Sequence, residues 1–199
     1  MKIIAITGGV ATGKTTVTKF LSSFLKAKII DADEISHKLL APGGKTWEKA
    51  VQSFGENILK KDSSIDRKAL GQHVFCDASQ RKKLEKIVHP AVKKDIKDKL
   101  KQFRRNHQEW VIMDIPLLFE AKMEHMADKI IVVVRNRKSQ IEALLKGKKL
   151  SLKEAENRIN SQLPLSEKEK LADFVVDNNG KIQETEKQVR EIFLSLQNM

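Results

Sequence analysis

The chain has 199 residues, of which 40% are apolar and 32% are charged, a balance that excludes a disordered chain and fits a globular protein. Its 38 lysines and arginines exceed its 26 acidic residues by 12, so we expect a polyanionic partner: a nucleic acid, an anionic membrane or a phosphorylated small molecule. The single cysteine, Cys76, excludes an intrachain disulfide, and no apolar run approaches the roughly 20 residues that cross a bilayer, so we expect a cytoplasmic protein.

Five short runs rich in isoleucine and valine predict β-strands. They lack strict alternation of apolar and polar residues, which is typical of strands buried on both faces of a parallel sheet. The runs are Ile3–Thr7, Lys28–Asp31, Trp110–Asp114, Ile130–Val134 and Phe174–Asp177.

Helical patterns separate these runs. Apolar residues recur every three or four positions from Val17 to Leu25, from Leu84 to Phe103 and from Val189 to Leu196. Strands that alternate with helices predict a three-layer α/β fold, in which a five-stranded parallel sheet is joined by right-handed crossovers.

Four single residues carry local expectations. Pro90 is expected to start or kink a helix. Ser151 and Ser166 are each followed three residues later by glutamate, so each is predicted to cap the start of a helix. Cys76 is expected to be a small, buried, apolar residue.

Two connections between the strands are longer than a single crossover requires. We therefore expect one domain of residues 1–199 with a core and two helical insertions. The core comprises about residues 1–33, 110–135 and 173–199, and the insertions comprise about 34–109 and 136–172.

Residues 8–15 read GGVATGKT and match the phosphate-binding pattern G-x-x-x-x-G-K-[ST] completely, between a predicted strand and a predicted helix. Glycines let backbone N–H groups face phosphate oxygens, and the helix start adds a partial positive charge. Lys14 is expected to reach the β- and γ-phosphates of ATP, and the Thr15 hydroxyl to ligate Mg²⁺. The candidate ATP-binding residues here are Gly8, Ala11, Thr12, Gly13, Lys14, Thr15 and Thr16.

The loop predicts a P-loop nucleoside triphosphatase fold. The rest of the chain indicates which class of P-loop protein this is. Asp177–Gly180 fits the D-x-x-G of GTPases, but it lies late in the chain and no N-K-x-D follows it. Asp114 lacks the adjacent acid that is typical of motor ATPases. Small-molecule kinases have this size, with one insertion that holds the acceptor (34–109) and another that closes over ATP as a lid (136–172).

Asp33 and Asp114 follow or end predicted strands, at the sheet edge where ligands bind. Asp33 is predicted to accept the proton of the acceptor hydroxyl, although such a residue could instead cap a helix beginning at Glu34. Asp114 is predicted to take part in the metal site by holding a metal-bound water, with a buried turn acid as the equal alternative.

From Lys2 to about Gly180 the chain resembles the dephospho-CoA kinase family. The order of Asp31-Ala32-Asp33, His89-Pro90 and the Pro116–Glu120 segment makes the resemblance more specific than the P-loop alone. The segments that carry it are Thr7–Gly9 with the P-loop, Asp31–His37, Phe54-Gly55, Ile65–Leu70, Leu84–Pro90, Asp114–Glu120, Arg158–Gln162 and Ala172–Gly180.

The resemblance implies ATP-dependent phosphorylation of the ribose 3′-hydroxyl of dephospho-CoA, with Mg²⁺, to give coenzyme A and ADP. It implies that Asp33 is the base and that Arg158, Asn178 and Gly180 contact ATP. The residues that it places around the acceptor are Asp33, His37, Arg67, His89, Leu117 and Leu118.

Each acceptor residue also has a structural interpretation. Arg67 could form an ion pair with Asp66 or another surface acid, His37 could be a satisfied structural histidine, and His89 could simply precede a helix-starting proline. Leu117 and Leu118 could be ordinary core residues.

The chain departs from the family at a pattern written Gln-x-x-Arg-Leu-x-x-Arg, because Ala143 and Gly147 replace the two arginines after Gln140. Lys146, Lys148 and Lys149 supply point charges nearby, but an ammonium group lacks the planar fork of a guanidinium. Because a lid arginine stabilises transition-state charge, we expect a slower, still active enzyme.

Residues 81–105 hold eleven basic and three acidic residues, a net charge of 11 − 3 = +8. Such a helix could follow a nucleic acid backbone, but only Phe103 interleaves the charges, so we favour a solvated face that attracts anionic substrates. We expect ATP and dephospho-CoA as partners, no nucleic acid or membrane, and a monomer. The alternatives are another P-loop kinase acting on a nucleotide or small metabolite, or a nucleotide-gated nucleic-acid-binding protein.

Overall fold

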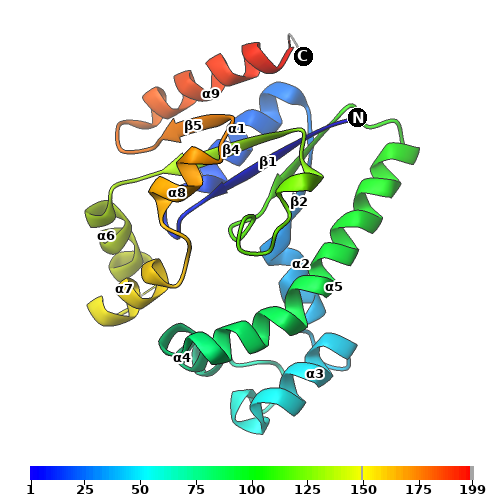
Figure 1. The fold of residues 1–199 in the computed structure, drawn as a ribbon, viewed down its shortest axis with the longest axis vertical. Coiled ribbons are helices and arrows are strands. Elements are labelled where there is room, and N and C mark those ends of the chain that lie inside the picture. The colour runs from blue at the N-terminus through cyan, green and yellow to red at the C-terminus, as the bar shows by residue number, and fades with distance from the viewer. Residues whose placement is uncertain (149, 198–199) are drawn as a thin grey trace. The chain divides into compact units, whose positions relative to one another are not determined.

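The computed structural model describes residues 1–148 and 150–197, and within them lies a five-stranded parallel sheet (Figure 1). The strand order is β2-β3-β1-β4-β5, and every adjacent pair is parallel. This confirms the predicted α/β class and the five predicted strands. Their bounds are β1 (Lys2–Gly8), β2 (Lys28–Asp31), β3 (Trp110–Asp114), β4 (Lys129–Val134) and β5 (Phe174–Asp177).

The chain divides into two compact units, which we describe separately. The first unit comprises Met1–Asp31 and Leu100–Met199, and the second comprises Ala32–Lys99. Our assignment of 34–109 to acceptor binding and of 136–172 to a lid stays a prediction.

The first unit contains the whole sheet. Its helices are α1 (Lys14–Leu25), η2 (Glu124–Met126), α6 (Arg137–Lys148), α7 (Leu152–Asn160), α8 (Leu165–Lys170) and α9 (Ile182–Gln197). The second unit contains α2 (Ala32–Leu39), α3 (Lys45–Phe54), η1 (Glu56–Ile58), α4 (Arg67–Cys76) and most of α5 (Ala78–Arg105).

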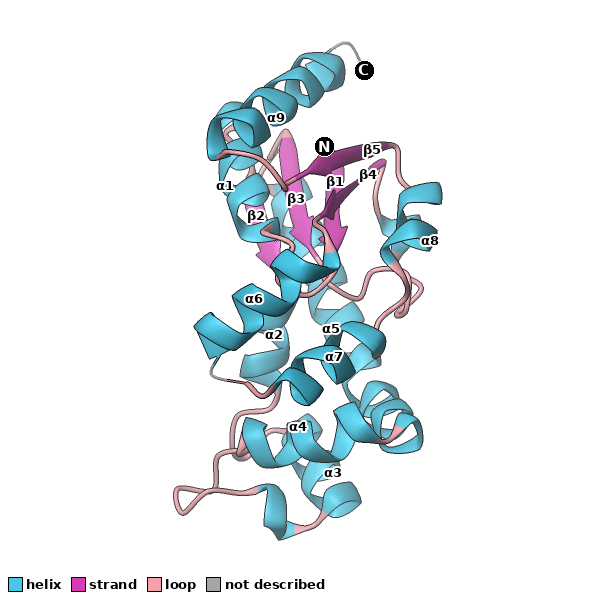
Figure 2. Ribbon diagram, turned by 90° about the vertical axis from the view of Figure 1, so that its left-hand side faces the viewer, coloured by secondary structure: helices cyan, strands magenta, loops and turns pink. Residues whose placement is uncertain are grey.

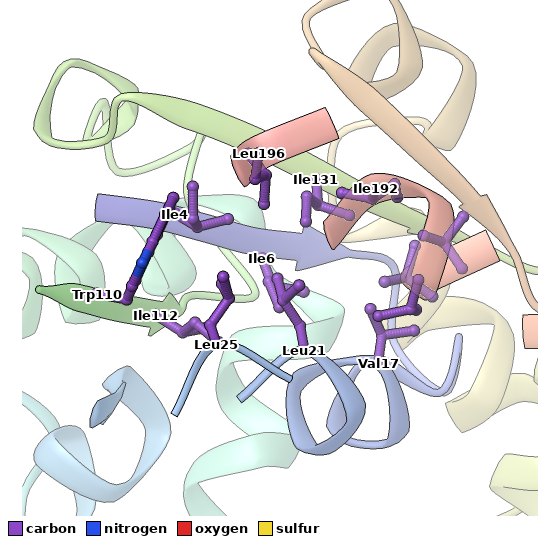
Figure 3. Close-up of a cluster of buried hydrophobic side chains, with 13 residues drawn as sticks. Ile4, Ile6, Val17, Leu21, Leu25, Trp110, Ile112, Ile131, Ile192 and Leu196 are labelled. Carbon is purple, nitrogen blue, oxygen red and sulfur yellow. The ribbon is translucent and has the colours of Figure 1, made fainter. Parts of the chain in front are cut away.

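Helices α1 and α9 cover one face of the sheet. Ile4 and Ile6 point to this face from β1, and Leu21 of α1 and Leu196 of α9 pack against them in one buried cluster (Figure 3). Alternation along β1 places Ile3 and Ala5 on the other face, where they are buried as well. Burial on both faces explains why this strand reads as a continuous apolar run.

In Figure 2, α6 lies beyond the carboxyl ends of the strands, on the side where the loop after β1 emerges. Strand β1 lies at the centre of the sheet, between β3 and β4. Strands β2 and β3 extend the sheet on one side of β1, and β4 and β5 extend it on the other, so the strand order reverses at β1. A crevice at such a reversal is the general ligand site of open α/β sheets. The fold therefore places residues 8–15 where a ligand is expected.

The second unit has a small core of its own. Ala50, Ile58, Ile65, Leu70 and Val74 are buried together, with Trp47 and Phe54 packed against them. None of the helices in the part of the chain that the structure describes is long and apolar enough to cross a membrane.

Asp66 starts helix α4 by accepting hydrogen bonds from the N–H groups of Lys68 (2.8 Å) and Ala69 (3.2 Å). The bond from the Ala69 N–H, followed by that from Lys68, lowers the pKa of the Asp66 carboxyl, because both N–H groups favour its charged form. Asp66 is thus a helix cap, and no ion pair joins it to Arg67 in the described ranges 1–148 and 150–197.

The local expectations meet mixed outcomes. Ser151 forms the predicted capping box with Glu154. Ser166 lies inside α8, which Pro164 precedes as the N-cap, and Pro90 lies within the continuous helix α5. Cys76 is exposed, because it follows buried Val74 by two residues and a helix turns about 100° per residue, which carries it away from the core face.

Leu196→Ala is expected to lower the free energy of unfolding by about 2–5 kcal/mol, because it leaves a cavity beneath α9 in the main core. Urea denaturation measures this. Leu194→Ala, at a leucine of the same helix that is 54% exposed, is the matched control and should change stability by less than about 0.5 kcal/mol. Equal losses in the two variants would contradict the assignment of the buried face of α9.

Candidate active site

Residues 8–15, the P-loop, connect the central strand β1 to helix α1. Gly13 precedes α1 with φ of 90°, a left-handed conformation that favours glycine, and no side chain caps the helix start. The first N–H groups of an uncapped helix lack intrahelical acceptors and, with the helix dipole, attract anions. The loop therefore has the local geometry of a phosphate site.

Asn178, which follows β5, holds this loop from the side. Its Nδ2 donates to the carbonyl oxygen of Thr12 at 2.8 Å, and its Oδ1 accepts from the Thr185 hydroxyl at 2.8 Å. The amide of Asn178 also occupies the space that a Cβ atom on Gly13 would require. Gly13 is thus required for two reasons, its backbone conformation and the close approach of Asn178.

Lys14 forms an ion pair with Asp114, the last residue of β3, with 2.8 Å between Nζ and Oδ1. Both side chains are largely shielded from solvent, at 14% and 10% exposure. The second carboxylate oxygen of Asp114 accepts from the Thr18 hydroxyl at 3.0 Å. Asp114 thus orients the P-loop lysine, and it lies beside β1 because Ile6 and Asp114 are paired in the sheet.

Two glutamines hold the P-loop from the other side. The N–H of Val10 donates to Oε1 of Gln162 at 2.9 Å, and the carbonyl of Val10 accepts from Nε2 of Gln140 at 2.7 Å. Gln140 belongs to α6, and Gln162 follows α7. Neither glutamine was predicted as a site residue; the signal in the sequence was that Gln140 starts the family pattern in α6 and Gln162 ends the family-like segment Arg158–Gln162.

A fully buried lysine anchors the segment after β3. Lys168 of α8 forms an ion pair with Glu120 at 2.9 Å and donates to the carbonyl oxygen of Pro116 at 3.1 Å. Glu120 also accepts from the N–H of Leu163 at 2.9 Å, and Pro116 accepts from the hydroxyl of Thr7 in β1. The loop after β3 is therefore tied both to α8 and to the strand that carries the P-loop.

Two of the four acceptor residues predicted in the second unit line one cavity. His37 and Arg67 line one cavity of about 880 Å³, together with Ser36, Lys60 and Leu70. Asp33 is exposed in the first turn of α2, two residues after β2 ends. His89 lies within α5 and does not line this cavity.

The remaining predicted residues lie in the first unit. Leu118 is fully buried and Leu117 is partly exposed. Arg158 is partly buried in α7, and Gly180 is exposed between β5 and α9. In the P-loop, the hydroxyl of buried Thr12 donates a hydrogen bond to the carbonyl oxygen of Gly9. Gly8 is also buried, whereas Ala11 and Thr16 are partly exposed and Thr15 is exposed.

Ala143 and Gly147, where the family pattern has arginines, both lie in α6. A Cβ atom built on Gly147 meets no atom within 4 Å, so the position has room for a larger side chain. Lys146 is exposed, whereas Lys149 and the side chain of Lys148 lie outside the described residues.

Comparisons with known proteins agree on one family. Residues 2–184 match the family model described as dephospho-CoA kinase. The chain is 43% identical over 192 residues to a dephospho-CoA kinase of Carboxydothermus hydrogenoformans, covering 96% of this chain and 93% of that protein. It is 40% identical over 190 residues to the Oceanobacillus iheyensis enzyme of the same name, covering 96% and 95%. A solved structure of dephospho-CoA kinase from Campylobacter jejuni aligns over 100% of both chains with a TM-score of 0.69 and 31% identity.

Gly13→Ala is expected to weaken ATP binding at least about tenfold, because the left-handed backbone strains alanine by about 1–2 kcal/mol and its methyl group displaces Asn178. Calorimetric titration with a non-hydrolysable ATP analogue measures the change. Gly43→Ala is the matched control: its φ is 82°, but no atom lies within 4 Å of a Cβ built there. If Gly13→Ala bound the analogue as tightly as the wild type, the role of Gly13 in loop geometry would be wrong.

Proposed function

This chain belongs to the dephospho-CoA kinase family, and we propose how its P-loop, Asp33 and the cavity lined by His37 and Arg67 share the steps of that reaction. The enzyme phosphorylates the ribose 3′-hydroxyl of dephospho-CoA with ATP and yields coenzyme A and ADP. The ion pair that holds Lys14 beside a complete phosphate-binding motif is the observation that carries the proposal.

The P-loop binds the phosphates of ATP through its backbone N–H groups. Lys14 contributes the positive charge that the transferring phosphoryl group requires, and Asp114 keeps its ammonium group oriented before ATP binds. Preorganised charge of this kind lowers the barrier because it needs no rearrangement at the moment of transfer.

Thr15 and Asp114 would hold Mg²⁺. Hydroxyl and carboxylate oxygens are the donors that Mg²⁺ prefers, and this ion commonly takes only one or two protein ligands beside substrate phosphates. Thr15 is exposed in the P-loop and Asp114 is ion-paired with Lys14 of the same loop, so both donors lie at the candidate phosphate site. When bound, Mg²⁺ neutralises charge on the β- and γ-phosphates.

Asp33 acts as the base. Its carboxylate accepts the proton of the 3′-hydroxyl while the oxygen bonds to the γ-phosphorus and the bond from that phosphorus to the β,γ-bridging oxygen breaks. The exposed position of Asp33 suits a group that must reach a diffusible acceptor.

His37 and Arg67 bind the acceptor in the cavity of the second unit, where a guanidinium can pair with a phosphate in two parallel hydrogen bonds. His89 and Leu117 complete the acceptor set, whereas Leu118 has the full burial of an ordinary core residue. Arg158, Asn178 and Gly180 contact ATP, and Asn178 supports this role by its bond to the carbonyl of Thr12 in the P-loop.

The partners and location follow from this chemistry. The substrates are small phosphorylated molecules, so the positive charge of α5 attracts them without binding nucleic acid or a membrane. The enzyme acts as a monomer in the cytoplasm.

Asp33→Asn is expected to lower kcat about 10²–10⁴-fold while the affinity for ATP changes less than twofold, because the amide cannot take up the hydroxyl proton. Coupled ADP release and detection of coenzyme A by mass spectrometry measure turnover. Glu34→Gln removes the neighbouring exposed carboxylate, which is paired with Lys38, and should leave turnover unchanged. Loss of ATP binding in Asp33→Asn would instead indicate a structural role; that role is not the helix cap considered from the sequence, because α2 begins at Ala32 and Asp33 lies within its first turn.

Gly147→Arg is expected to raise kcat several-fold, because a guanidinium returns to a family position in α6 that has open space. Gly147→Met is the control for the gain in helix propensity, since it adds a long side chain without charge. Unchanged or lower turnover in Gly147→Arg would show that the missing arginine does not limit the reaction.

A further inference from the structure

A cavity of about 390 Å³ lies beside the P-loop in the first unit. Gly9 and Val10 of the P-loop form one part of its wall, and Asn160 at the end of α7 forms another. Arg135 and Arg137, from the turn between β4 and α6, also line it. The lining contains these two cationic side chains and no acidic residue, so the cavity carries an uncompensated positive charge.

Arg137 is oriented by a neutral partner. Both of its terminal nitrogens lie 3.1 Å from Oδ1 of Asn160. No carboxylate within the described residues forms a salt bridge with this guanidinium. Asn160 therefore fixes the guanidinium in place and leaves its charge available to an anion.

Arg135 has fewer hydrogen-bond partners than Arg137. Its Nε atom is buried and has no hydrogen-bond partner, and no ion pair to it occurs in the part of the chain that the structure covers. Arg135 as a whole is only partly buried, but a buried N–H group without an acceptor is costly, and an anion in the cavity that accepts from it would offset that cost.

The turn that carries the two arginines is rigid. Between them, the N–H of Asn136 donates to Oδ1 of Asn179 at 2.8 Å, and the side chain of Asn136 accepts from the N–H of Ser139 at 2.8 Å. The first of these bonds ties the turn to the loop after β5, and the second starts α6. Arg135 and Arg137 are therefore held on either side of a residue that is fixed in both directions.

From these observations we propose that Arg135 and Arg137 form a subsite for phosphoryl oxygens beside the P-loop. Guanidinium groups suit this ligand because they bind phosphate oxygens in pairs. Arg137 is the first residue of the 12-residue helix α6, whose dipole adds to the field. Leu163 and Leu165 also belong to the wall and supply its apolar part.

The proposal rests on the proposed function in one respect: the ligand is a phosphoryl group of that reaction. It can be the terminal phosphate of ATP or the diphosphate of dephospho-CoA. The two sources present the same oxyanion chemistry, and binding measurements separate them.

The experiment compares wild-type protein with the double variant Arg135→Gln/Arg137→Gln by calorimetric titration. The probes are ADP, a non-hydrolysable ATP analogue and dephospho-CoA, each titrated separately. A loss of at least tenfold for the ATP analogue with ADP unchanged assigns the subsite to the terminal phosphate. The same loss for dephospho-CoA alone assigns it to the acceptor diphosphate, and either result supports the proposal.

Lys138→Gln is the matched control, because it removes one positive charge from the neighbouring, exposed position that does not line the cavity. The subsite is refuted if all three probes bind the double variant as they bind the wild type, or if Lys138→Gln weakens binding equally. Arg137→Lys is a milder test should the double variant unfold, because it keeps the positive charge but removes the planar guanidinium. We expect at least threefold weaker binding in Arg137→Lys. Unchanged binding would overturn the role of Arg137. Formation of coenzyme A by the wild type tests the proposed function separately.

Discussion

The ion pair between Lys14 and Asp114 joins the start of α1, at the end of the P-loop, to the last residue of β3, and the geometry of the candidate site depends on it. The pair forms because β1 and β3 are neighbours, so the end of β3 lies beside the start of the P-loop. Buried pairs of this kind contribute little net stability, but removing one partner leaves an uncompensated charge and costs about 3–5 kcal/mol. The pair therefore serves to position Lys14 more than to stabilise the fold.

Uncharged amides hold the rest of the loop. Asn178 bonds to Thr12, while Gln140 and Gln162 take both backbone hydrogen-bonding groups of Val10. These contacts come from the loop after β5, from α6 and from the segment after α7. Val10 thus connects the P-loop to α6 and to the segment after α7, both of which lie within the predicted lid.

Lys168 shows how the fold tolerates a charge in its interior. It is fully buried, but Glu120 and the carbonyl of Pro116 surround its ammonium group with acceptors. Burying a lysine without such partners would be costly. The arrangement fixes the loop after β3 against α8, where the Pro116–Glu120 segment carries part of the family resemblance. Arg135, by contrast, has a buried nitrogen with no such partner.

The sequence by itself determined the features that depend on nearby residues. Isoleucine and valine runs predicted the five strands, and GGVATGKT predicted the loop because its geometry is local. The expected burial on both faces holds for β1 and β3 but not for the edge strands β2 and β5, where Ile29 and Val175 are exposed because no strand covers their outer side. The sequence also predicted the cap at Ser151 but misplaced the start of α8, where Pro164 precedes the helix.

Only the tertiary structure decided the contacts between distant segments. The pairing of Lys14 with Asp114, the two glutamines on Val10 and the burial of Lys168 follow from strand order and packing, which no local pattern encodes. A short motif determines its own backbone conformation, because that conformation depends on adjacent residues. The residues that orient its side chains come from distant segments, and the pairing of the strands brings those segments together.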